Sequence, residues 1–375
     1  MATTNPLQAA LQAAVDDGAF PGAVLAVRLR GTLIYEGAVG RLSPQIPGEG
    51  VTIHTCYDLA SLTKVLATTT ALLLLMQRGK LTLDDRIDRI LIALQGSAAG
   101  AASIHQLLTH SSGLPGWRPY YERLASLEAG QAGFPGRTAA REAVLGYIAQ
   151  EALVYERGSR SLYSDLGFML LGWAVERLAG ESLDQFCNNQ IYRPLEAQPL
   201  AYVPRESQAM PAASLESHAI APTEDDPWRG RMLCGEVHDE NAFALGGVAG
   251  HAGLFGTARA VLAVAKAWMY GRRGKTGLLQ PDLVTLFTTR QQGIPNASWA
   301  LGWDTPSAPS SSGTRFTPES FGHLGYTGTS LWIDPVKELE VVLLSNRVHP
   351  TRKNERIKTF RPLIHDLICR EFLGD

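Results

Sequence analysis

An apolar run from Val65 to Met76, preceded directly by Ser61-Leu62-Thr63-Lys64, constrains this 375-residue chain more than any other feature. A run of this length and composition predicts a helix that is buried on nearly every side. Because an α-helix turns once in about 3.6 residues, a serine and a lysine three positions apart lie on the same face. The pattern therefore predicts a buried amine beside the hydroxyl of Ser61.

Two interpretations of this tetrapeptide are open. Burial makes a charged lysine costly, which predicts a lowered pKa for Lys64 and proton transfer from Ser61 near neutral pH. The alternative is a capped helix start with an exposed lysine. Two further segments bear on the choice.

The first segment is Leu162-Tyr163-Ser164-Asp165-Leu166-Gly167-Phe168, in which a tyrosine precedes an apolar helix that ends near Gly180. By itself, Tyr163 is more typical of a core or rim aromatic residue than of an acid–base group. The second segment is Gly322-His323-Leu324-Gly325-Tyr326-Thr327-Gly328-Thr329-Ser330. It leads into two predicted strands, at 331–333 and 339–344, joined by a turn at 334–337.

In this order the three segments resemble the serine β-lactamase and penicillin-binding-protein superfamily. The signature of that family is Ser-x-x-Lys, then Tyr-x-Asn or Ser-x-Asn, then Lys-Thr-Gly. The tyrosine and histidine forms seen here resemble the branch that holds class C β-lactamases, D-alanyl-D-alanine peptidases and family VIII-type esterases. The segments 105–115 and 250–258 are also similar to parts of that branch.

The resemblance implies a role for each matching residue. Ser61 would attack a carbonyl and form an acyl-enzyme, while Lys64 and Tyr163 would share the transfer of its proton. Which of the two is the base stays open, since they would titrate together. The backbone N–H groups of Ser61 and Tyr326 would form the oxyanion hole. His323 would polarise the site and either hold a substrate carboxylate or bond to Tyr163.

Two departures from the family pattern affect specificity. Asp165 replaces asparagine and would pair with Lys64 or favour a cationic or amide-donating substrate group. Leu324 replaces threonine, which removes a hydroxyl that helps the family bind a substrate carboxylate, and both changes weaken the case for an efficient β-lactamase. A shifted register, with 326–328 as the third element, is the alternative. The residues predicted to bind or polarise the substrate are Asp165, His323, Gly325, Tyr326 and Thr327.

A competing signal is Val237-His238-Asp239-Glu240-Asn241-Ala242, followed by His251, since these side chains can bind zinc or another divalent cation. The cluster lacks a third nearby histidine, so we favour a hydrogen-bonded loop beside the cleft. Asp239 and Asn241 are then candidate cleft contacts, and no metal or cofactor is expected. Trp117 either lines the cleft or packs under a loop.

The order of elements predicts an α/β (α+β) fold of the β-lactamase/transpeptidase type. An antiparallel sheet built from both chain termini would be flanked by helices, with a mainly helical region inserted and the site in the cleft between them. We expect one catalytic domain over 1–375, with the sheet in about 1–60 and 290–375 and the helical region in about 61–289. Predicted helices cover 6–17, 61–78, 103–109, 138–150, 165–179, a stretch from Ser182 with a capping box to Gln185, and 354–372; amino-terminal strands cover 23–29 and 32–38.

Composition and charge exclude several classes of function. The chain is 45% hydrophobic and 19% charged with a net charge of −2, and it has no basic block, so no nucleic acid is expected. The run at 65–76 is too short to span a bilayer, so no membrane partner is expected. The absence of a basic residue before Arg28 and four widely spaced cysteines indicate a reduced, cytoplasmic location. Oligomeric state cannot be read from the sequence.

Three functions follow as hypotheses. The first is a serine hydrolase that cleaves an amide or ester bond in a small-molecule or peptide substrate, with peptidoglycan-derived peptides as one class. The second is a carboxylesterase on the same scaffold. The third is a non-catalytic homologue that binds peptides, which the intact set of Ser61, Lys64 and Tyr163 argues against.

Overall fold

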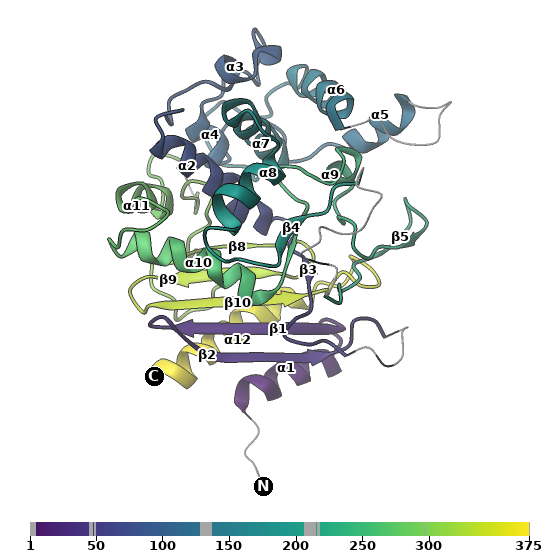
Figure 1. Ribbon diagram of the computed structural model, residues 1–375, viewed down its shortest axis with the longest axis vertical. Coiled ribbons are helices and arrows are strands. Elements are labelled where there is room, and N and C mark those ends of the chain that lie inside the picture. The colour runs from purple at the N-terminus through teal and green to yellow at the C-terminus, as the bar shows by residue number, and fades with distance from the viewer. Residues whose placement is uncertain are drawn as a thin grey trace.

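Strands from the two ends of the chain pair in one sheet in the computed structural model (Figure 1). The sheet has the order β2-β1-β10-β9-β8, and every neighbouring pair is antiparallel. The predicted sheet from both termini is therefore confirmed. Its strands are β1 (Gly22–Leu29), β2 (Thr32–Gly40), β8 (Phe321–Leu324), β9 (Ser330–Asp334) and β10 (Leu339–Ser345). The structure describes residues 5–44, 48, 50–127, 137–205, 215, 218–295 and 297–374.

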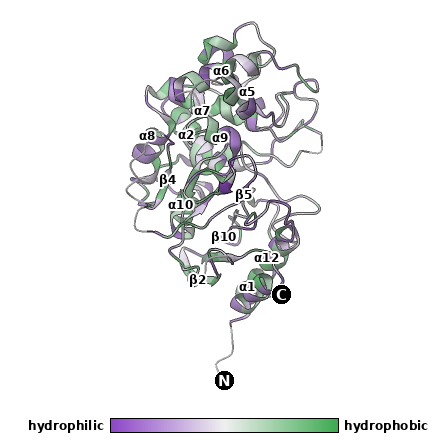
Figure 2. Ribbon diagram, turned by 90° about the vertical axis from the view of Figure 1, so that its right-hand side faces the viewer, coloured by the Kyte–Doolittle hydropathy of each residue, from purple (hydrophilic) through white to green (hydrophobic). Residues whose placement is uncertain are grey.

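Both faces of this sheet are buried. Val24 and Ala26 of β1 pack in the large core shared with the helical region, whereas Leu25 and Val27 pack against α1 (Pro6–Asp16) and α12 (Ile357–Leu373). This alternation is the period of two expected of a strand with two covered faces. Figures 1 and 2 both place α1 and α12 at the end of the molecule opposite α6 (Arg137–Ala149).

The inserted region is mainly helical, as predicted, and lies above the sheet in Figure 1. Besides α6, the predicted helices found there are α2 (Thr70–Gln77), α4 (Ile104–Leu108), α7 (Asp165–Ala179) and α8 (Leu183–Cys187). Further helices there were not predicted: α3 (Ile87–Ile90), α5 (Tyr120–Leu127), α9 (Glu240–Ala244), α10 (Ala258–Arg272) and α11 (Pro281–Thr288). Short strands pair as β3 (Tyr57–Asp58), β7 (Leu254–Gly256) and β4 (Leu200–Tyr202), and as β5 (Asp225–Asp226) with β6 (Arg231–Met232).

The capping box predicted at Ser182 is wrong. The Ser182 side chain makes no capping hydrogen bond, and at this helix start the Leu183 N–H donates to Glu176 of the preceding helix at 3.1 Å. A capping box does form at α4, where Ser103 and Gln106 each accept from the other's backbone N–H.

The helix predicted over 61–78 is irregular at its start. Residues Lys64–Thr69 form a π-helical segment before α2 continues, and all of them are buried. The Thr70 hydroxyl donates to the Val65 carbonyl at 2.7 Å and accepts from the Trp268 indole at 3.1 Å, which satisfies a carbonyl within the widened turn. Such segments recur at functional sites. Within the described ranges, no helix combines the length and apolar character needed to cross a bilayer.

Candidate active site

Lys64 is fully buried and lies beside Ser61. Its Nζ is 3.0 Å from Ser61 Oγ, 2.6 Å from Asp165 Oδ1 and 3.0 Å from the His251 carbonyl. The Asp165 carboxylate at this distance forms an ion pair with the ammonium form of Lys64, and that form can donate to all three groups.

The lowered pKa predicted for Lys64 is wrong. Burial does lower it, but the nearby Asp165 and Tyr163 raise it by more, so the pKa of Lys64 ends above its ordinary value. Asp165 occupies the first turn of α7, and this helix begins at Ser164, whose hydroxyl accepts from the Gly167 N–H. The expected pairing of Asp165 with Lys64 is thus present in the structure.

Tyr163 lies against the same amine, with its ring centroid 4.8 Å from Lys64 Nζ. Burial raises the pKa of Tyr163, and Asp165 raises it further; the charge of Lys64 and hydrogen bonding with Lys64 and Ser61 lower it in part, leaving it above its usual value. The Tyr163 ring stacks on Trp299 at 5.6 Å between centroids, and Trp299 was not singled out from the sequence. The three residues predicted to do the chemistry are therefore adjacent.

His323 faces Tyr163 across 5.9 Å between ring centroids and is buried. Its Nδ1 donates to the Leu324 carbonyl at 2.8 Å, so Nε2, which has no partner among the described residues, carries a lone pair. Burial and the nearby charge of Lys64 lower the pKa of His323 to about 3. A neutral ring with its lone pair on Nε2 cannot donate to a substrate carboxylate. Of the two expected roles, the one that fits is a hydrogen bond that His323 accepts, as from the Tyr163 hydroxyl.

A turn at 325–329 lies against the segment that leads to Ser61. Thr327 Oγ1 donates to the Asp58 carbonyl at 2.7 Å, and Thr329 Oγ1 donates to the Leu59 carbonyl at 3.0 Å. Thr327 is only 1% exposed, and its side chain ties the two segments together. A Cβ at Gly325 would lie 2.5 Å from the Leu59 carbonyl oxygen, which explains why this position has no side chain.

The two N–H groups expected to form an oxyanion hole are available. In the part of the chain that the structure describes, the N–H groups of Ser61 and Tyr326 donate to no protein acceptor. Ala60, just before Ser61, has a φ of 47°, a conformation uncommon for alanine, and its N–H is held by Asp58 Oδ1 at 2.8 Å. A strained backbone of this kind persists only where surrounding contacts hold it, and such residues cluster at active sites.

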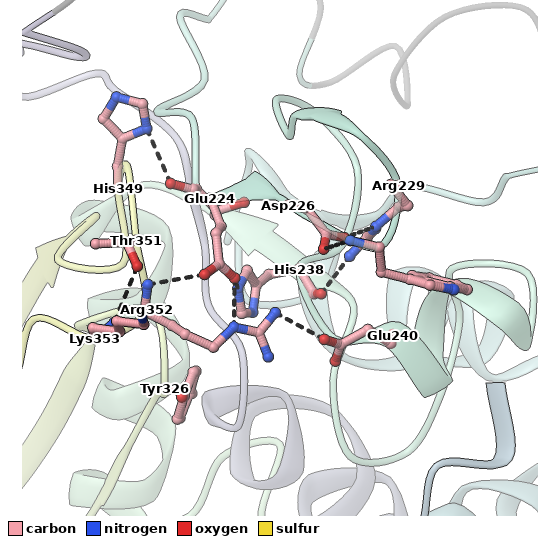
Figure 3. A network of polar contacts seen from close by, with 12 residues as sticks. Glu224, Asp226, Arg229, His238, Glu240, Tyr326, His349, Thr351, Arg352 and Lys353 are labelled. Carbon is pink, nitrogen blue, oxygen red and sulfur yellow. Dashed lines mark hydrogen bonds and ion pairs between the residues drawn. The ribbon is translucent and has the colours of Figure 1, made fainter. Parts of the chain in front are cut away.

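The histidines of the competing metal cluster are each bonded to a different carboxylate. His251 Nε2 is 2.9 Å from Asp239 Oδ1, and His238 Nε2 is 2.9 Å from Glu224 Oε2. Arg352 bridges Glu224 and Glu240 in the same network (Figure 3). Over the described residues, no group of three potential metal-binding side chains comes together. The segment reads as a polar network that also orients the His251 carbonyl toward Lys64.

The candidate cleft contacts divide by exposure. Asn241 is 1% exposed, and its side-chain amide accepts from the Tyr121 N–H and donates to the Arg118 carbonyl, so it holds a loop in place. Asp239 is occupied by His251, and this contact lowers the pKa of Asp239 well below its usual range although burial opposes it. Trp117 and Tyr326 are 43% and 50% exposed and remain accessible to a ligand.

With this geometry established, comparison with known proteins defines the class. The β-lactamase family model matches residues 7–365, and the chain belongs to that family. It is a serine hydrolase related to the penicillin-binding proteins.

Named relatives agree with this assignment. A protein of Escherichia coli (strain K12) that bears the provisional name D-alanyl-D-alanine carboxypeptidase is 35% identical over 331 residues, covering 84% of this chain and 73% of that protein. An N-acetylmuramyl-L-alanine amidase of Bacillus subtilis (strain 168) is 31% identical over 355 residues, covering 88% and 78%. The fold is shared with EstCE1, a hydrolase with promiscuous acyltransferase activity, at a TM-score of 0.71 and 23% identity over 96% of this chain and 97% of that one.

Proposed function

We propose that this chain cleaves an amide bond, in a small-molecule or peptide substrate, through an acyl intermediate on Ser61. The observation that carries the proposal is the placement of Lys64 Nζ, which contacts Ser61 Oγ and Asp165 while lying over Tyr163. A non-catalytic peptide binder has no need for a buried ammonium aimed at a partly exposed hydroxyl. The names of the relatives support peptides derived from peptidoglycan as the substrate class.

The proposed reaction moves one proton out and one back. Ser61 Oγ attacks the carbonyl carbon while its proton passes to the Lys64–Tyr163 pair, and the N–H groups of Ser61 and Tyr326 bind the resulting oxyanion. The pair then protonates the leaving amine as the C–N bond breaks. Water hydrolyses the acyl-serine and restores the hydroxyl.

The pair must lose a proton before it can accept one. Lys64 donates in all three of its directions at rest, and the pKa values of both Lys64 and Tyr163 are raised. We therefore expect acylation to accelerate as the pH rises above neutral, with a single apparent pKa that belongs to the pair.

A carboxylesterase is the second candidate function. Leu324 supplies no hydroxyl, and the neutral His323 supplies no cation, so the positions that would hold a substrate carboxylate in this family do not provide for one. Esters of short neutral acids need no such contact. The same site would cleave them by the same acyl-serine route.

A panel of substrates separates these proposals. Turnover would be measured with p-nitrophenyl butyrate, a chromogenic cephalosporin and a muropeptide, in wild type, in Ser61→Ala and in wild type treated with a chelator. We expect Ser61→Ala to lose all activity and the chelator to have no effect. Faster muropeptide cleavage supports the first proposal and faster ester turnover supports the second. Chelator-sensitive turnover, or activity that survives in Ser61→Ala, would contradict both.

A further inference from the structure

Arg361, on α12, is a buried cation with no carboxylate partner among the described residues. Its side chain lies behind the turn at 325–329 and the residue is 5% exposed. Nη2 donates to the Gly325 carbonyl at 3.1 Å and to the Thr329 carbonyl at 2.8 Å, and its Nε has no partner. Within the described ranges, no carboxylate forms an ion pair with it, and the neighbouring charge is the cation Arg347.

Such an arrangement is costly. An ionised side chain removed from water is ordinarily stabilised by an opposite charge, and apolar residues of similar size often stabilise a protein as well or better. Burial and Arg347 lower the pKa of Arg361 to about 9, which records the same cost and still leaves the guanidinium charged at neutral pH. Packing alone does not account for an arginine here.

The acceptor of Arg361 provides a reason. The Gly325 carbonyl belongs to the peptide unit whose N–H is that of Tyr326, one of the two groups expected to bind the oxyanion. A cation bonded to the carbonyl end of a peptide polarises the whole unit and makes its N–H a stronger donor. Because the N–H is fixed in place by the tethered turn, this effect needs no rearrangement during the reaction.

The neighbouring Arg347 bonds to a different peptide unit of the same turn. Its Nε donates to the Tyr326 carbonyl at 2.9 Å, and its guanidinium lies 4.5 Å from the centroid of the Tyr326 ring. That carbonyl belongs to the next peptide unit, whose N–H is that of Thr327. The two buried arginines thus bond to consecutive peptides, and only one of these carries the expected oxyanion donor.

We propose that Arg361 is a positioning residue that strengthens the oxyanion hole through the Gly325–Tyr326 peptide bond. This inference rests on the proposed acyl-serine chemistry at Ser61. The inference adds that Arg361 polarises one N–H donor of the oxyanion hole through the peptide backbone, without contacting the substrate.

The test compares Arg361→Met, which removes the charge, with Arg361→Lys, which keeps it. We would measure kcat and KM with p-nitrophenyl butyrate, affinity for butylboronic acid, which mimics the tetrahedral adduct on Ser61, and the melting temperature. For Arg361→Met we expect kcat and boronate affinity to fall by about 10- to 100-fold with KM changed less than about twofold. We expect its melting temperature to hold or rise, since an unpaired buried charge is gone. Arg361→Lys should recover most of the loss.

Arg347→Met is the matched control. It removes a guanidinium that bonds to the same turn, but the Gly325 carbonyl keeps its hydrogen bond from Arg361. We expect a smaller fall in kcat than in Arg361→Met. An equal fall, a loss in Arg361→Lys as large as in Arg361→Met, or a drop in melting temperature or failure to fold that accompanies the lost activity would overturn the inference. A wild-type enzyme that binds no boronate and turns over neither the ester nor the muropeptide would instead overturn the proposed function.

Discussion

Two buried cations flank the candidate site, and they differ in how their charge is met. Lys64, on the helical side, donates to the Asp165 carboxylate at 2.6 Å. Arg361, on the sheet side, donates to two carbonyls and to no carboxylate among the described residues. Both side chains are close to fully buried, so solvent does not explain the difference.

The comparison indicates a division of labour. An anion beside Lys64 holds its proton in place and ties proton movement at Ser61 to the state of the whole pair. The charge of a cation that has no paired anion is not neutralised locally. The charge of Arg361 therefore polarises the Gly325–Tyr326 peptide unit, whose N–H is expected to bind the oxyanion. One side of the site would handle protons while the other stabilises charge.

The largest effect is expected from removal of the helical cation. In Lys64→Met the hydroxyl of Ser61 loses the amine that contacts it, and kcat/KM should fall on the order of 10³-fold or more. Stopped-flow acylation with p-nitrophenyl butyrate would measure this. A fall no larger than that of Arg361→Met would break the distinction between the two sides.

Replacing the anion should move the pH profile. Asp165 raises the pKa of both Lys64 and Tyr163, so in Asp165→Asn both pKa values drop and the pair loses its proton at lower pH. The acid limb of kcat/KM should shift downward by about one unit or more, and β-lactam turnover should rise because the family's amide is restored. Asp239→Asn serves as a comparison, since Asp239 bonds to His251 and acts on Lys64 only through its charge, so the acid limb should shift less than in Asp165→Asn. An unmoved limb in Asp165→Asn would contradict the account of this position.

A smaller effect is expected at the tether between the two sides. Thr329→Val keeps the shape of the side chain but removes one of the two donors to the buried Leu59 carbonyl, which keeps the Leu62 N–H. The loss of this hydrogen bond should cost about 0.5–1.5 kcal/mol of unfolding free energy. The turn would also shift relative to Ser61, so kcat should fall severalfold with little change in KM. Urea denaturation and steady-state kinetics would measure both. A loss of stability with unchanged kcat would show that the tether does not position the oxyanion donors.

Features set by residues close together in the sequence were predicted, and several features set by contacts between distant residues were not. The strands of the sheet, the hairpin at 334–337 and the adjacency of Ser61 and Lys64 arise from local patterns, and the structure contains all three. The pKa of Lys64 was misjudged although its pairing with Asp165 was expected, because a partner 101 residues away gives no indication in the sequence that it outweighs burial. Arg361 had no signal at all, since nothing in 354–372 shows that its side chain reaches Gly325.

For Thr327 and Asn241, the structure shows hydrogen-bond partners that the sequence could not indicate. Both are polar residues in segments near the site, which is the usual signature of a substrate contact. Their polar atoms instead form hydrogen bonds with backbone groups far along the chain. A sequence pattern gives the residue type near a site but not the partner that satisfies it.

The account is tested most directly by locating the acyl group itself. Wild type and Ser61→Ala would be treated with a fluorophosphonate at pH 7 and pH 9, digested, and mapped by tandem mass spectrometry. We expect one modified residue, Ser61, labelled faster at pH 9, and no label in Ser61→Ala. A label on another residue, or no label on wild type at either pH, would contradict the claim that Lys64 and Tyr163 prepare Ser61 to accept an acyl group.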